Sequence, residues 1–234
     1  MMETIHPECQ TLMRYVLAGD EPAAFRLVER LIDDGTRPED VLLRLIAPVQ
    51  ANIGELWARN RLSVVDEHVA SYINERLTVA CTAGERPSRR PGRLVVACPE
   101  GEWHALPARL LAETLRLHGY SVSFLGASVP AAHLLSYLQQ HDPAAVLLSI
   151  SLSVRLPSAR RSAMAARQAG VPVMCGGRGF GDTARWAHRL GADAWAADAV
   201  KAVAVLDDWP PPRADSVELL VDEEYDRLLK ETPD

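Results

Sequence analysis

The stretch Leu94-Val95-Val96-Ala97-Cys98-Pro99-Glu100-Gly101-Glu102-Trp103-His104-Ala105-Leu106-Pro107 indicates how this chain folds. Its first five residues are an apolar run typical of a buried strand, and a helical pattern follows over residues 105–118. A histidine between a strand and a helix lies at the carboxyl end of the strand, where open α/β sheets bind ligands. Glu102 stands two residues before His104, where a carboxylate can orient the imidazole ring. The alternative is a surface histidine beside a surface glutamate.

Strand and helix patterns alternate from residue 93 to residue 209, with short connections between them. Five such units predict a parallel sheet whose two faces are both covered by helices. The flavodoxin-like strand order 2-1-3-4-5 suits this count and places the ligand crevice above the first and third strands, beside His104. The predicted strands are Leu94–Cys98, Ser121–Leu125, Ala145–Ser149, Val171–Met174 and Ala194–Ala196, and the predicted helices are Ala105–His118, Ala131–Gln140, Pro157–Ala169, Asp182–Leu190 and Asp198–Leu206.

Residues 1–84 show a different pattern, because their apolar side chains recur at helical spacing in four segments. Gly19 and Gly35 end the first two segments, and a polar break at Asn60 precedes the last one. Four amphipathic helices with short connections predict an antiparallel four-helix bundle. The predicted helices cover residues 7–18, 21–34, 37–60 and 63–82.

Two further segments flank the predicted sheet domain of residues 93–209. Residues 85–92 are polar and rich in proline and arginine, which favours an interdomain linker over a loop within one domain. Residues 210–234 begin with three prolines and continue as an acidic C-terminal tail. A short amphipathic helix is predicted in this tail, either docked on the protein or frayed.

The composition is that of an ordinary globular protein, with 48% hydrophobic and 24% charged residues in a chain of 234. A net charge of −6 argues against a general nucleic-acid-binding surface. No run approaches the ~18 apolar residues of a membrane span, and the first residues do not form a signal peptide, so a cytoplasmic protein is predicted. The cysteines are scattered without CxxC pairing, which favours reduced thiols over a zinc site. They are Cys9, Cys81, Cys98 and Cys175.

Residues 93–209 resemble the cobalamin-binding domain, whose motif is DxHxxG, then SxL about 41 residues later, then GG. Here Glu102–Pro107 stands at the first part, the 41 positions 108 to 148 follow, and Ser149-Ile150-Ser151 and Gly176-Gly177 complete the set. The resemblance implies that cobalamin binds with His104 as the lower axial ligand of cobalt, in place of the cofactor's own base. It further implies contacts to the cofactor from Glu102, Trp103, Pro107, Ser149, Ser151, Gly176 and Gly177.

Elementary chemistry agrees with these assignments. The neutral imidazole of His104 suits a borderline transition metal, and Glu102 would hold its other nitrogen. Ser149 would donate to the buried nucleotide tail, and the two glycines would let a bulky ligand pass close to the backbone, although a simple strand-end turn is their alternative. The sequence departs from the motif where Glu102 replaces Asp, Pro107 replaces Gly and Ser151 replaces Leu, and only 24 positions, 152 to 175, precede the glycines.

The predicted bundle contains a second motif. Trp57, nine residues, and then Glu67-His68 resemble the W-x9-EH motif of the CarH-type light-sensing repressors. The resemblance implies that Trp57 covers the upper face of cobalt and that Glu67 and His68 contact the adenosyl group of adenosylcobalamin. Glu102 in place of Asp also occurs in that branch of the family. The alternative places Trp57 in the bundle core and Glu67-His68 in a solvated turn.

The chain also differs from those repressors. They have a histidine directly after the tryptophan, which captures cobalt after the adenosyl group is lost, whereas Ala58 stands here. Water or a shifted His68 is the alternative ligand of the photoproduct. The repressors carry a winged-helix domain ahead of the bundle, and no basic recognition helix precedes the bundle in this sequence. Direct nucleic-acid binding is therefore not expected.

These features together predict a cobalamin-dependent light sensor rather than an enzyme. Light would cleave the cobalt–carbon bond of adenosylcobalamin held between bundle and sheet. The change would reach a light-sensitive homo-oligomer, dimer or tetramer, or an unidentified effector protein. Photocobilin-like, stand-alone members of this family imply a second chromophore, biliverdin, for which no residue is assigned. The alternatives are a corrinoid methyl carrier serving a methyltransferase and a flavodoxin-like module without cobalamin.

Overall fold

The computed structural model describes residues 7–208, and the predicted tail lies outside them. The chain divides into two compact units, with the boundary between Arg86 and Pro87, inside the predicted linker. The later part of that linker belongs to the second unit. The amide of Arg90 donates to the Gly119 carbonyl (2.9 Å), and its guanidinium donates to the Tyr120 hydroxyl (2.9 Å) and pairs with Asp207.

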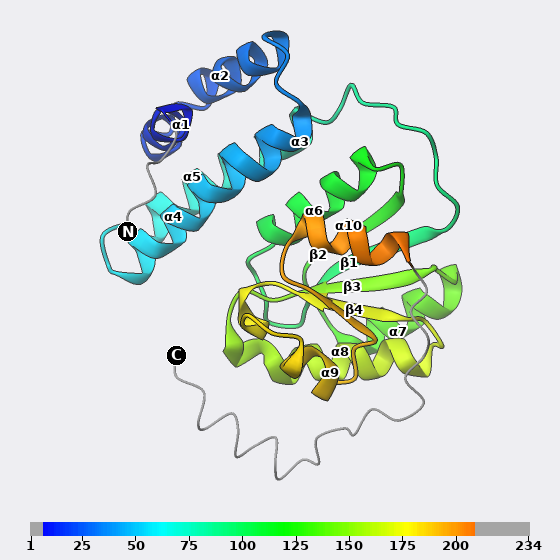
Figure 1. Ribbon diagram of the computed structural model, residues 1–234. Helices are drawn as coiled ribbons and strands as arrows, with labels where there is room; N and C mark the ends of the chain where they lie inside the picture. Colours follow the sequence, from blue (N-terminus) through cyan, green and yellow to red (C-terminus); the bar gives the residue numbers. More distant parts are fainter. Residues whose placement is uncertain (1–6, 209–234) are drawn as a thin grey trace. The chain divides into compact units, whose positions relative to one another are not determined.

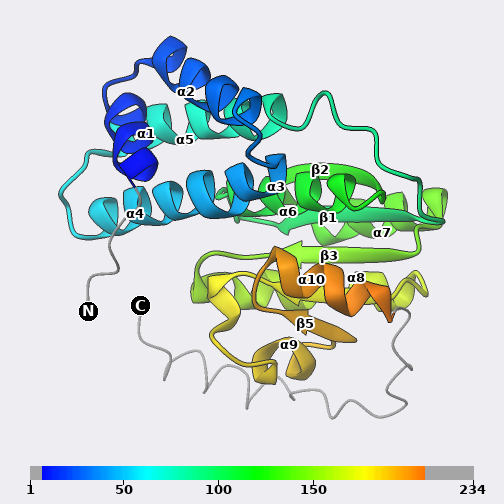
Figure 2. The same ribbon diagram turned by 45° about the horizontal axis from the view of Figure 1, so that its top comes forward.

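The first unit is built of helices (Figures 1 and 2). Helices α1 and α5 contact each other, and each of them also contacts α2 and α4. A capping box starts α5, because the Ser63 hydroxyl accepts from the Asp66 amide and the Asp66 carboxylate accepts from the Ser63 amide. The elements are α1 (Pro7–Leu17), α2 (Glu21–Asp33), α3 (Pro38–Asp40), η1 (Val41–Ile46), α4 (Ala47–Ala58) and α5 (Val64–Ala80).

A π-helical turn interrupts the long third helix of this unit. It covers Val41–Ile46 and is followed directly by Pro48 in the first turn of α4. Proline has no amide hydrogen and its ring crowds the carbonyl four residues earlier, which here belongs to Arg44. The Arg44 carbonyl instead accepts from the thiol of Cys9 on α1 (3.4 Å). The sequence pattern predicted one regular helix over residues 37–60 and missed this turn.

The second unit is a five-stranded parallel sheet with the order β2-β1-β3-β4-β5, which confirms the predicted flavodoxin-like fold. Apolar strands buried on both faces and helices between consecutive strands dictate this arrangement. The strands are β1 (Arg93–Pro99), β2 (Ser121–Val129), β3 (Ala145–Ser149), β4 (Val173–Gly176) and β5 (Ala194–Ala196). The helices are α6 (Leu106–Leu117), α7 (Ala131–His141), α8 (Leu156–Gln168), α9 (Arg185–Arg189) and α10 (Ala199–Asp207), with short 3-10 turns η2 (Ser153–Arg155) and η3 (Arg178–Phe180).

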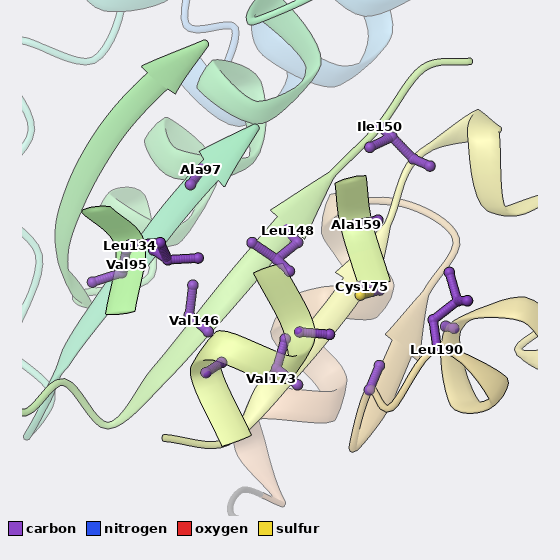
Figure 3. Close-up of a cluster of buried hydrophobic side chains, with 14 of the residues drawn as sticks. Val95, Ala97, Leu134, Val146, Leu148, Ile150, Ala159, Val173, Cys175 and Leu190 are labelled. Carbon is purple, nitrogen blue, oxygen red and sulfur yellow. The ribbon is translucent and has the colours of Figure 1, made fainter. Parts of the chain in front are cut away.

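Alternate residues of each strand point to opposite faces of the sheet, and each face has its own core. Val95, Val146 and Val173 face α7, α8 and α9, where they meet Leu134 and Ala159 (Figure 3). The other residues of the same strands pack against α6 and α10, which contact each other (Figure 1). This second core contains Leu94, Val96, Cys98, Leu115, Leu147, Met174 and Leu206.

Candidate functional site

The loop between β1 and α6 places His104 at the carboxyl end of the sheet, where β1 and β3 lie side by side and the strand order reverses. The Glu102 side chain is fully buried beneath this loop, whereas 40% of the His104 side chain is exposed. One carboxylate oxygen, Oε1, lies 2.5 Å from Nδ1 of His104 and 2.9 Å from its amide nitrogen. The other oxygen, Oε2, accepts from the Ser151 amide (2.7 Å). Glu102 therefore ties the loop after β1 to the loop after β3.

This network determines the tautomer of His104. A carboxylate can only accept hydrogen bonds, so Nδ1 carries a proton, and in the neutral ring the lone pair lies on Nε2. Burial alone raises the pKa of Glu102, but the hydrogen bonds from the His104 ring, the Ser151 amide and the His104 amide outweigh it and hold this pKa below its ordinary value. Histidines that bind metals commonly have the same arrangement, in which a carboxylate accepts a hydrogen bond from the ring nitrogen that does not bind the metal.

The sequence reasoning missed two residues that support the loop. Ser128, at the end of β2, accepts from the Gly101 amide through its hydroxyl (3.0 Å) and donates its own amide to the Glu102 carbonyl (2.9 Å). Its φ of 53° is unusual for a residue other than glycine. Arg155 lies over Gly101, where an added Cβ would come within 2.7 Å of Nη1. The sequence does not reveal that a serine in a strand pattern has a positive φ. It also does not reveal that an arginine from another loop lies over Gly101.

Three other predicted residues lie at the carboxyl ends of β3 and β4. Ser149 is buried at the end of β3, beside Gly176 in register. A Cβ on Gly176 would come within 2.7 Å of the Ala196 carbonyl oxygen, and one on Gly177 within 2.3 Å of the Ile150 oxygen. Close backbone contacts within the protein are therefore enough to explain why both positions are glycine. Their contact with a cofactor stays a prediction.

Of the remaining predicted residues, Trp103 and Pro107 are exposed, and Ser151 lies in the loop after β3. Trp103 is 72% exposed, although it stands between two residues of the hydrogen-bonded network. Pro107 is exposed in the first turn of α6, where proline is tolerated because its missing amide hydrogen would have no partner in the helix. Ser151 contributes its backbone amide to Glu102, and a residue of any type except proline would supply that donor.

The residues of the bundle motif lie on two helices of the first unit, α4 and α5. Trp57 lies in the last turn of α4 and is 39% exposed, so it is not a fully buried core residue. Glu67 and His68 lie in the first turns of α5, with His68 Nε2 3.7 Å from Glu67 Oε2. The Glu67 side chain is mostly covered, and its other oxygen accepts from the Ser71 hydroxyl (2.6 Å). The structure thus brings Glu67 and His68 together on one helix.

The donor set fits a cofactor that needs one axial nitrogen. Nε2 of His104 carries the lone pair, the buried carboxylate fixes the ring, and the side chain is partly exposed above the sheet. Within residues 7–208, no three His, Cys, Asp or Glu side chains gather as a ligand set for a bare metal ion. Over the same residues, no helix combines the length and the apolar character that crossing a bilayer requires.

Glu102→Gln is expected to lower the affinity for cobalamin by about 10- to 100-fold, the usual effect of losing a carboxylate behind a metal-bound histidine. The amide turns one acceptor into a donor, so one of the three hydrogen bonds to the side chain of residue 102 is lost and the His104 tautomer is no longer fixed. Cobalamin titration followed by absorbance measures the effect. Glu100→Gln is the matched control, because Glu100 lies in the same loop with an exposed side chain. Equal affinities for the two variants would contradict the role of Glu102.

Comparison with known proteins matches both units to cofactor-binding families. Residues 92–204 match the family model described as B12 binding domain, and residues 8–80 match a second model of the same description. Two repressors of Myxococcus xanthus are similar in sequence. The HTH-type transcriptional repressor CarA is 33% identical and CarH is 28% identical, over 75% and 73% of this chain. The chain spans 59% of the length of each repressor.

Corrinoid proteins are similar as well. Dimethylamine corrinoid protein 1 of Methanosarcina acetivorans is 25% identical over 83% of this chain and 93% of its own length. Among solved structures, the monomethylamine corrinoid protein of Methanosarcina barkeri superposes with a TM-score of 0.72, covering 85% of this chain and 96% of its own. Its sequence identity is 17%, so this likeness establishes a shared fold.

Proposed function

We propose that this chain, a cobalamin-binding protein made of B12-binding domains, uses adenosylcobalamin to sense light. Cobalamin binding itself is supported by both family models and by the corrinoid relatives. The observation that carries the light-sensing proposal is the Trp57, Glu67 and His68 group. Trp57 is 39% exposed at the end of a helix and is therefore not buried in the bundle core. Glu67 and His68 contact each other.

In this proposal His104 would hold the cobalt of the cofactor through Nε2, and Glu102 would orient its ring. Trp57 offers a flat apolar surface against the upper group, and Glu67 with His68 supplies polar contacts to ribose and adenine. Adenosylcobalamin brings a cobalt–carbon bond that visible light breaks. Once the upper group is gone, Trp57, Glu67 and His68 lose the partner they packed against, and the helices that carry them rearrange.

The proposed output is a change in domain packing, in homo-oligomeric state or in the binding of an effector protein, and the protein is regulatory rather than catalytic. The proposal that the bound form is adenosylcobalamin depends on the same three bundle residues. Biliverdin as a second chromophore remains a prediction without an assigned residue. Ala58, which is exposed, offers no ligand for a photoproduct, so water or a shifted His68 would take that position.

A corrinoid methyl carrier is the second candidate, favoured by the dimethylamine corrinoid protein that matches over 93% of its own length. A methyl carrier needs the His104 network and a helical cap. It has no evident need for an indole with a carboxylate and an imidazole at this spacing, because a methyl group offers no hydrogen-bonding atoms. The two functions therefore differ in what Trp57, Glu67 and His68 contribute.

Dark incubation with adenosylcobalamin, removal of unbound cofactor, and illumination with green light test the proposal. A light sensor should retain the cofactor in darkness, change its absorbance spectrum in light, and change its elution volume in gel filtration. Trp57→Ala should reduce dark retention of adenosylcobalamin by about tenfold, since an aromatic contact beyond area burial contributes ~0.5–1.5 kcal/mol. The bundle should remain folded, because Trp57 is not fully buried.

Trp186→Phe is the matched control, since Trp186 packs against the core of the second unit. It changes the same residue type, and dark retention should match that of the wild type. A wild-type protein that retains the cofactor but keeps the same spectrum and elution volume in light would refute the sensor. Transfer of the methyl group of protein-bound methylcobalamin to an acceptor thiol, catalysed by an added methyltransferase and leaving cob(I)alamin on the protein, would establish the second candidate instead.

A further inference from the structure

A column of polar side chains runs between α4 and α5 and ends on Glu67. Asn74 donates through its amide nitrogen to Oε1 of Gln50 (2.9 Å). Gln50 donates through its amide nitrogen to the Ser71 hydroxyl (2.7 Å). Ser71 in turn donates to Oε1 of Glu67 (2.6 Å). Three hydrogen bonds therefore connect the packed interior of the bundle to the carboxylate of the bundle motif.

The chemistry of the groups fixes the direction of this column. The ionised Glu67 only accepts, so the Ser71 hydroxyl must donate to it. The Ser71 oxygen then accepts from the NH2 group of Gln50, which turns the Gln50 carbonyl toward Asn74 and requires the NH2 group of Asn74 to face it. Each amide orientation follows from the previous one, and all donors point toward Glu67. Such chained hydrogen bonds reinforce one another in a medium of low dielectric constant.

Burial increases toward the Asn74 end. Asn74 is fully buried, and the structure gives its Oδ1 atom no hydrogen-bond partner. A buried acceptor without a partner destabilises the fold, so packing alone does not favour an amide at this position. The neighbours Ile73 and Leu77 are apolar and buried. The Asn74 amide is thus explained by what its NH2 group does for Gln50 rather than by packing.

The column also follows the faces that carry the motif. On α5, Glu67, Ser71 and Asn74 recur at intervals of four and three residues, which places them on one face. On α4, Gln50 and Trp57 are seven residues apart and share a face as well. Gly54 lies between them, and a Cβ there would meet no atom within 4 Å. The column therefore runs along the same sides of the helices as the proposed contacts to the upper group.

We propose that Ser71 and Gln50 are positioning residues that hold the Glu67 carboxylate for the ribose of the upper group. They thereby set the preference of the protein for adenosylcobalamin over cobalamins with a small upper ligand. Ser71 occupies Oε1 of Glu67, which leaves Oε2 turned toward His68 (3.7 Å) to accept from ribose hydroxyls. Without Ser71 the carboxylate can rotate and its acceptors are no longer aimed. This inference rests on the proposed function.

Dark affinities for adenosylcobalamin and hydroxocobalamin, compared in the full chain, test the proposal. Ser71→Ala should weaken adenosylcobalamin binding about tenfold, because the Glu67 carboxylate loses the hydrogen bond that orients it, and leave hydroxocobalamin binding within twofold. Ser71→Thr keeps the hydroxyl and should keep the preference. Gln50→Leu removes the hydrogen bond to Ser71 and should weaken adenosylcobalamin binding about threefold. Thr11→Ala is the control, because the Thr11 hydroxyl bonds only within α1, to the Pro7 carbonyl.

The double variant with Glu67→Gln shows whether Ser71 acts through Glu67. In that background Ser71→Ala should add less than a twofold loss, whereas independent roles would multiply. If Ser71→Ala lowered the affinity for both cobalamins equally, Ser71 would only support the fold of the bundle, and this inference would be overturned. A wild-type protein with no preference between the two cobalamins would overturn the proposed function as well. A wild-type preference that survives both Ser71→Ala and Gln50→Leu refutes the positioning role alone.

Discussion

His104→Ala is expected to lower cobalamin affinity by more than about 100-fold and to remove the absorbance signature of imidazole-ligated cobalt. The reason is that Nε2 of His104 is the axial nitrogen of the proposed site, and a metal ligand contributes more than the carboxylate behind it, whose loss costs about 10- to 100-fold. The variant should remain folded. The His104 side chain is 40% exposed, and Glu102 keeps its two backbone donors, the amides of residues 104 and 151.

Dark titration with adenosylcobalamin, read by absorbance, measures this loss. Adding free imidazole to the variant should partly restore the spectrum, because the side chain removed leaves room beside the Glu102 carboxylate. His133→Ala is the control, since His133 is exposed and belongs to a different element, α7. An unchanged spectrum in His104→Ala would show that another group, or the cofactor's own base, holds the lower position.

Gly177→Ala is expected to destabilise the second unit more than any other single methyl addition at its carboxyl edge. Gly177 has φ 96° and ψ 160°, a region that is essentially restricted to glycine, which costs other residues roughly 1–3 kcal/mol. The new Cβ would also lie 2.3 Å from the Ile150 carbonyl oxygen. That oxygen cannot move away freely, because it accepts from the Gly179 amide (3.1 Å). Relieving the clash should add roughly 1–3 kcal/mol.

Gly181→Ala separates the two effects. Gly181 ends the same short turn with φ 74° and ψ −165°, and a Cβ there meets nothing within 4 Å. It therefore carries the backbone strain without the clash. Urea unfolding of both variants, with the midpoints and slopes compared, gives the difference in the free energy of unfolding. Equal losses would mean that the backbone near Ile150 yields at no cost, and that Gly177 is required only for its dihedral angles.

The sheet was predictable because each strand is an apolar run and each run is followed by a helical pattern. The β3 and β5 boundaries agree with the predictions. Strand β4 lies two residues later than predicted, over Val173–Gly176, because Pro172 cannot donate to the ladder and pairing begins after it. Helix α9 is shorter than predicted, over Arg185–Arg189, and the short turn η3 ends at Gly181 with a positive φ of 74° before it. Such boundaries depend on backbone geometry that residue types alone do not specify.

The candidate site was predictable to a similar extent. Glu102 and His104 stand close in sequence, so their interaction follows from spacing alone. The amide of Ser151 that completes the carboxylate comes from a different loop, and backbone donors leave no trace in sequence. Gln50 and Ser71 are 21 residues apart and polar, so nothing in the pattern distinguished them from solvated positions. Side chains that act by orienting others become visible only once the helices are packed.

The π-helical turn at Val41–Ile46 has a consequence for the rotational phase of α4. Each residue of an α-helix turns the chain by about 100°, so the extra residue of a wide turn rotates everything that follows by that amount relative to a regular helix. Gln50, Gly54 and Trp57 all lie after the turn. One widened turn earlier in the chain therefore determines which side chains of α4 lie beside α5. The Arg44 carbonyl that accepts from the Cys9 thiol is part of that turn.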